Sequence, residues 1–94
     1  MFDYIKRFNA FLDMSMGTLE VNEVAVYVRL FQLNNNYHRT EWFGVLNINL
    51  AQLTGLNEKT LIKARNALKQ KGYIDFVPGK KGQKTQYTLL PIEN

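Results

Sequence analysis

The segment from Leu50 to Phe76 constrains the fold of this chain more than any other. It predicts a short helix that stops at Gly55 and a second helix that begins after Asn57 and ends at Gly72, because glycine favours helix C-termini and asparagine caps helix N-termini. Apolar residues of the second helix recur at i, i+3 and i+7, so they share one buried face: Leu61, Ala64 and Leu68. Two helices joined by a tight glycine turn are typical of a helix-turn-helix.

A β-hairpin is predicted directly after this pair of helices. Residues Tyr73–Val77 alternate as a half-buried strand does, Pro78–Gly82 is a turn sequence, and Lys84–Leu89 returns as the paired strand. The loop of this hairpin is basic. A helix-turn-helix that continues into such a hairpin is a winged helix, and the hairpin is its wing.

Further elements are predicted ahead of the motif. Apolar residues at helical spacing indicate an amphipathic helix over Phe2–Met14 and a second helix over Asn22–Asn34, with Asn22 as its cap. A β-rich run at Trp42–Ile48 predicts a strand, and Asn49 is placed to cap the short helix Leu50–Thr54. The predicted fold class is therefore α+β and mostly helical: one winged-helix domain over residues 1–94, with two additional N-terminal helices.

The helix over Asn22–Asn34 carries apolar residues on two sides and therefore needs two surfaces to cover them. One is the core of its own domain, and the other is either the first helix or a second copy of the chain. Because a domain of 94 residues is only marginally stable alone, we expect a homodimer or higher oligomer. The residues predicted to form its interface lie on the first two helices: Ile5, Phe8, Leu12, Val26, Leu30 and Leu33.

Composition excludes several classes of function. The chain has no cysteine and a single histidine, His38, so thiolate or histidine metal sites are not expected, and no cofactor is indicated. The sequence has no apolar run long enough to span a membrane, and charges near its N-terminus do not fit a signal peptide, so we expect a cytoplasmic protein. The phosphate-loop, nucleophile-elbow, paired-histidine and dinucleotide-binding motifs are all missing, so we expect a binding module and not an enzyme.

Positive charge is concentrated in one part of the chain. Residues 57–88 contain eight basic and two acidic residues, a net charge of +6, whereas residues 1–56 contain four basic and five acidic residues, a net charge of −1. This asymmetry favours a polyanionic partner on one side of the domain. The alternative is a solvated lysine-rich surface.

Duplex DNA is the partner that fits a basic helix-turn-helix. The residues of the second helix predicted to meet it are Asn57, Glu58, Lys59, Thr60 and Lys63, with Asn66 further along. Asn57 also fits a helix cap, and Glu58 also fits a first-turn residue that complements the helix dipole. Arg65 fits a packing role or an internal ion pair, and Lys69 and Lys71 fit solvated positions at the end of the helix.

The wing supplies the second set of candidate contacts: Lys80, Lys81, Gln83 and Lys84. Basic hairpins of this kind contact phosphates or reach into the minor groove. The alternative is a turn that only keeps the protein in solution.

The chain resembles the N-terminal winged-helix domain of DnaD-like replication initiators, the replisome organisers of Gram-positive bacteria and their phages. The resemblance rests on three segments, which are Val24–Leu30, Phe43–Ile48 and Leu53–Phe76, and on the order of the elements. It implies that the domain binds origin DNA and self-associates. It also implies contact with helicase-loading proteins through a C-terminal part, which we expect to be missing because this chain stops at Asn94, shortly after the wing.

The function predicted from the sequence is therefore DNA binding in a phage- or plasmid-type replication initiator. A transcriptional repressor of the same fold is an alternative, since a simple repressor needs no effector pocket. A protein-interaction scaffold that has lost DNA binding is another.

Overall fold

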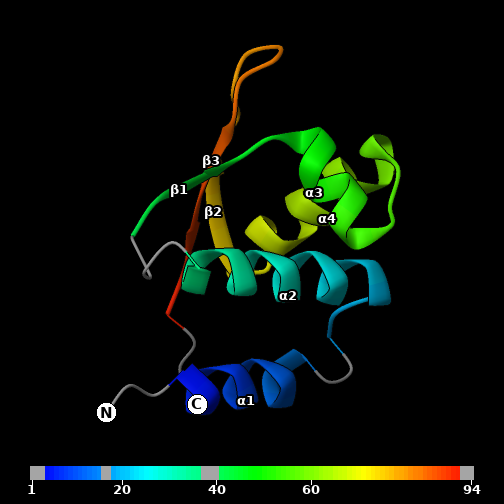
Figure 1. Ribbon diagram of the computed structural model, residues 1–94. Helices are drawn as coiled ribbons and strands as arrows, with labels where there is room; N and C mark the ends of the chain where they lie inside the picture. The colour runs from blue at the N-terminus through cyan, green and yellow to red at the C-terminus, as the bar shows by residue number, and fades with distance from the viewer. Residues whose placement is uncertain (1–3, 16–17, 37–40, 92–94) are drawn as a thin grey trace.

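The computed structural model describes residues 4–15, 18–36 and 41–91, which form helices and one small antiparallel sheet (Figure 1). In chain order the elements are α1 (Tyr4–Ser15), α2 (Val21–Asn36), β1 (Phe43–Val45), α3 (Asn47–Thr54), α4 (Glu58–Gln70), β2 (Ile74–Val77) and β3 (Thr85–Leu89). The strand order is β1-β3-β2. The predicted class, α+β and mostly helical, is confirmed.

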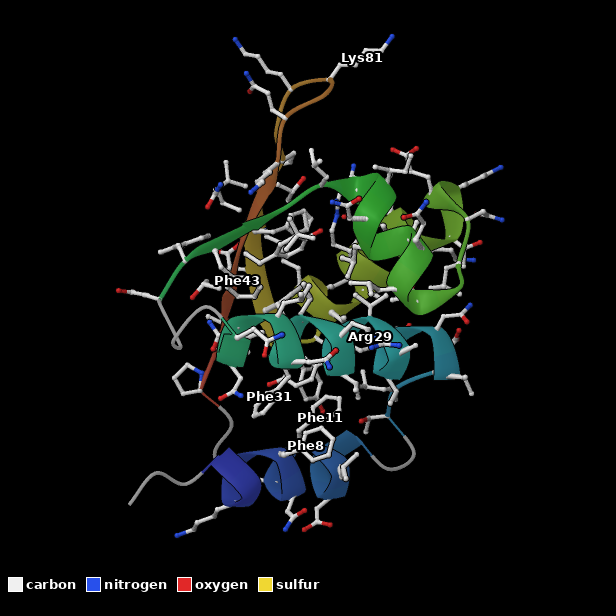
Figure 2. The ribbon with its side chains drawn as sticks, in the orientation of Figure 1. Phe8, Phe11, Arg29, Phe31, Phe43 and Lys81 are labelled. Carbon is white, nitrogen blue, oxygen red and sulfur yellow. The ribbon has the colours of Figure 1, made fainter. Side chains whose placement is uncertain are left out.

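Helix α2 lies in the middle of the fold, with α1 on one side and α3, α4 and the sheet on the other (Figure 1). Phe11 and Phe8 point from α1 toward α2 (Figure 2). The ring of Phe11 stacks on Tyr27 with centroids 3.8 Å apart, and that of Phe8 lies 5.4 Å from Phe31. Aromatic side chains bury much apolar surface each, so these few contacts hold α1 in place.

The second apolar stripe of α2 is covered by the chain itself. Because Tyr27 and Phe31 face α1, the stripe that contains Val26 and Leu30 faces α3, α4 and the sheet, and both residues are completely buried in the single chain. They are therefore not available to a second copy, contrary to the prediction. Of the other predicted interface residues, Phe8 and Leu33 are partly buried against the core and Leu12 is 40% exposed. The side chain of Ile5 lies outside the described residues.

Helix α2 begins at Val21, so the predicted cap at Asn22 is wrong. The carbonyl of Glu20 accepts the first helical bond, from the amide of Val24 at 3.0 Å. The carboxylate of Glu23 in turn accepts from the Glu20 amide at 3.2 Å. This is the carboxylate half of a capping box, and it satisfies an amide that Asn22 cannot reach from inside the first turn.

Helix α3 also begins earlier than predicted. It starts at Asn47 after Leu46, with no side-chain cap, so Asn49 is an ordinary helical residue and the predicted strand Trp42–Ile48 shortens to β1. The predicted start is wrong because the carbonyl of Leu46 already accepts the first helical bond, from the Leu50 amide at 3.0 Å, which places Asn49 inside the first turn.

The predictions for α4 and the hairpin are confirmed. The side-chain oxygen of Asn57 accepts from the Thr60 amide at 2.7 Å, which caps α4. Gly55 and Gly72 follow the two helices with φ angles of 75° and 87°, a conformation that favours glycine. The hairpin strands β2 and β3 pair antiparallel with Phe76 opposite Tyr87, and each begins one residue later than predicted.

Substitution of Phe11 tests the attachment of α1. We expect Phe11→Ala to lower the free energy of unfolding by about 3–5 kcal/mol, because it removes a fully buried ring. The matched control is Leu12→Ala on the exposed side of the same helix, for which we expect a much smaller loss. Urea denaturation followed by circular dichroism measures both values, and equal losses would contradict the packing of α1 on α2.

Candidate functional site

One face of α4 points away from the core. Leu61, Ala64 and Leu68 are buried, as predicted, and the residues on the opposite side of the helix are exposed or half-buried. We call this surface the α4 outer face: Lys59, Ile62, Lys63, Asn66 and Gln70. It combines two ammonium groups, two carboxamides and one branched apolar side chain. Such a helix face can offer donors, acceptors and a methyl contact to base edges.

Other predicted residues flank this outer face. Thr60 is half-buried and lines, together with Lys63, a cleft beside the N-terminus of α2. Glu58 lies in the first turn of α4, where its charge complements the helix dipole. The side-chain oxygen of Asn57 is used in capping.

The loop between β2 and β3, residues 78–84, extends well beyond the body of the domain (Figure 1). Lys81 lies at its tip and points into solvent (Figure 2). A groove of about 250 Å³ separates the loop from the first residues of α3 and α4. Lys80, Lys81 and Gln83 line its loop side, with Glu58 and the 63% exposed Ile48 on the helix side. The groove therefore brings three predicted loop residues close to the start of α4.

Lys84 lies apart from these loop residues. Its side chain packs over Gly44 of β1, so closely that a Cβ atom at position 44 would lie 3.2 Å from Lys84 Cβ. It lines a different cleft, between α2, β1 and α3, together with Leu33 and Leu53. Of the four predicted wing residues, Lys84 is thus the one that does not face the groove beside α4.

Three of the eight basic residues in the range 57–88 are engaged within the fold. Arg65 is buried, Lys69 pairs with Asp75 at 3.2 Å, and Lys71 pairs with the buried Glu23 at 2.8 Å. The Lys69 ammonium lowers the pKa of the Asp75 carboxyl below its usual range. Lys69 and Lys71 are therefore not simply solvated, as the sequence suggested. Eight less these three leaves five lysines: Lys59, Lys63, Lys80, Lys81 and Lys84.

Arg65 connects α4 to α3 and to β3. Its Nη1 donates to Asn47 Oδ1 at 3.0 Å and to the Tyr87 hydroxyl at 3.2 Å, and its guanidinium lies 4.6 Å from the ring centroid of Phe76. Thr85 Oγ1 also donates to Asn47 Oδ1, at 3.3 Å. No carboxylate of the described residues pairs with Arg65, so the predicted packing role is confirmed and the ion pair is not found.

The sequence interpretation missed two parts of this site. Ile62 and Gln70 follow from helical spacing, since they lie three or four residues from Lys59, Lys63 and Asn66. The contacts of Arg65 carry no such signal, because Asn47 and Tyr87 are 18 and 22 residues away along the chain.

The described part of the chain has no gathering of three or more metal-ligating side chains, and none of its helices has the length and apolar character needed to cross a membrane. His38 lies outside the described residues. Comparison with models of protein families, with curated protein sequences and with solved structures gave no match.

The phenol of Tyr87 makes the stability of the domain depend on pH at alkaline values. Burial raises the pKa of Tyr87 above 10.0, and Arg65 opposes this only in part. Because the folded state favours the neutral phenol, its contribution is complete below the unfolded pKa of about 10 and declines as pH rises above it. We expect the urea midpoint to fall between pH 9.5 and about 11 more steeply for the wild type than for Tyr87→Phe. Parallel curves would show that Tyr87 does not titrate differently on unfolding.

Proposed function

We propose that this chain is a winged-helix domain that binds duplex DNA, with α3 and α4 as the helix-turn-helix, α4 as the recognition helix and the β2–β3 loop as the wing. One observation carries the proposal. Within residues 57–88, the five lysines that lie outside the core and make no ion pair among the described residues are on the α4 outer face or in the β2–β3 loop. Arg65 is buried, and Lys69 and Lys71 pair with carboxylates. A basic helix face beside a basic hairpin loop matches a major groove and the adjoining phosphate backbone.

The proposed contacts differ along this surface. Lys59 and Lys63 donate to guanine edges or phosphates, and Asn66 to adenine. Thr60 contacts a phosphate or a thymine methyl, and Glu58 accepts from cytosine. Lys80 and Lys81, with Gln83, bind the phosphate backbone beside the groove, while Lys84 reaches it only if it leaves its position over Gly44.

The biological role that we propose is replication initiation in a phage- or plasmid-type system, and it rests on the family resemblance alone. The same resemblance supports self-association. Two copies would present two copies of α4, which suits a repeated site with half-sites about 34 Å apart. Since Val26 and Leu30 are buried, the interface would have to use the more exposed residues of the predicted set, such as Leu12 and Leu33.

Removal of the two lysines on the α4 outer face tests the recognition helix. We expect Lys59→Ala combined with Lys63→Ala to weaken binding to a fluorescein-labelled duplex on the order of tenfold, or about 1.4 kcal/mol. Anisotropy titrations at several salt concentrations measure the affinity. Lys6→Ala, an exposed lysine on α1, is the control for loss of charge and should bind as the wild type does. If the wild type bound no duplex even at low salt, the protein-interaction scaffold would be the better assignment.

Removal of the loop lysines tests the wing. Affinity for DNA falls as salt rises, and each phosphate contact contributes about 0.9 to the slope of log affinity against log salt concentration. We expect Lys80→Ala with Lys81→Ala to reduce this slope by about one to two, whereas Lys84→Ala alone should change it less because Lys84 lies over Gly44. An unchanged slope in the double variant would remove the loop from the interface.

A further inference from the structure

The position of the β2–β3 loop relative to α4 is not determined by the sheet alone. The sheet is small, since β1 has three residues and β2 has four. Beyond Val77 and Thr85 the two arms of the hairpin are no longer paired as strands. The loop therefore leaves the sheet with few backbone restraints. Such short hairpins are marginally stable unless side chains pack against them.

A chain of polar contacts crosses from α4 to the base of this loop. Arg65 Nη1 donates to Asn47 Oδ1, the same oxygen accepts from Thr85 Oγ1, and Thr85 Oγ1 accepts from the Gly79 amide at 3.4 Å. Thr85 begins β3 and Gly79 lies in the opposite arm of the loop, so the chain of contacts closes across both arms. The second bond of Arg65, to Tyr87, ties the guanidinium to the middle of β3.

Arg65 is buried, so its guanidinium has few other acceptors to which it could turn. Its side chain is 5% exposed, and its Nε is buried with no partner among the described residues. A buried guanidinium without a carboxylate depends on the few acceptors it has, and loss of one leaves a buried donor unsatisfied. A Cβ atom on Gly79 would lie 2.4 Å from the Lys84 carbonyl oxygen, so the two arms are also in close contact where the network ends.

From these contacts we infer that Arg65 is a positioning residue of the proposed DNA interface: through Asn47 and Thr85 it holds the β2–β3 loop at a fixed distance from the α4 outer face. The inference rests on the proposed function for its biological meaning. Arg65 itself is buried and does not contact DNA. It acts by keeping Lys80 and Lys81 where they reach phosphates of the same duplex that α4 enters.

A distance measurement without DNA tests the positioning directly. The chain has no cysteine, so Gln70→Cys on α4 and Gln83→Cys in the loop accept two spin labels with no background. Double electron–electron resonance should give a narrow distance distribution for otherwise wild-type protein and a broader one for Arg65→Met. Arg65→Lys, which keeps a donor, should restore much of the narrow distribution.

A second variant covers the case in which Arg65→Met does not fold. Thr85→Val removes the hydroxyl between Asn47 and Gly79 but keeps the buried shape of the side chain, and it should also broaden the distribution. Folded variants that all keep the wild-type distribution would overturn the inference, whatever the DNA result.

The salt slope of DNA binding is a second readout. It would not change if Arg65 only stabilised the fold and did not position the loop. We expect Arg65→Met or Thr85→Val to lower the salt slope as far as Lys80→Ala with Lys81→Ala does, and the combination of both changes to lower it no further. Additive reductions would mean that Arg65 does not act through the loop. If the wild type bound no DNA while the distance distribution still broadened, the positioning would stand and the proposed function would fail.

Discussion

Burial of both apolar stripes of α2 is the constraint on which the rest of the structure depends. Tyr27 stacks on a ring from α1, while Val26 and Leu30 face the opposite side of the domain. A helix that is apolar on two sides cannot lie at the surface, so α2 occupies the middle and the other elements form layers around it (Figure 1). The α4 outer face and the β2–β3 loop take no part in this core, which leaves both surfaces free to carry polar and charged side chains.

The polar network around Arg65 follows from the same packing. Phe76 and Tyr87 lie opposite each other in the β2–β3 register with ring centroids 6.1 Å apart, and α4 packs its inner face against them. Arg65 lies on that inner face, so its guanidinium is buried over the Phe76 ring and must find acceptors within reach. The acceptors come from Asn47 and Tyr87. The requirement to satisfy one buried cation thus connects α3 and α4 to the β2–β3 hairpin.

Local sequence signals predicted much of this fold. The features that they did not predict are the exact starts of two helices and contacts between residues far apart in the sequence. Gly55, Asn57 and Gly72 were predicted correctly because their roles depend on backbone conformations and hydrogen bonds within a few residues. Asn22 and Asn49 have the right chemistry for caps, but the helices begin before them. The α4 outer face follows from helical spacing. By contrast, Lys71 meets Glu23 across 48 residues of sequence, and no periodic pattern reveals that pairing.

Fewer basic residues are left for the proposed contact with DNA than the net charge suggests, because some of them are engaged within the fold. The net charge of +6 in residues 57–88 includes Arg65, Lys69 and Lys71, which the fold already engages. In the proposed complex, the five lysines left in this range would neutralise at most about five phosphates and so contribute about 4–5 to the salt slope. On the proposed function, long-range attraction to DNA would therefore be modest, and the relative placement of α4 and the β2–β3 loop would matter more than total charge. An interface with five lysines would gain most from the proposed self-association, because two linked copies on one duplex raise the effective affinity without any new contact.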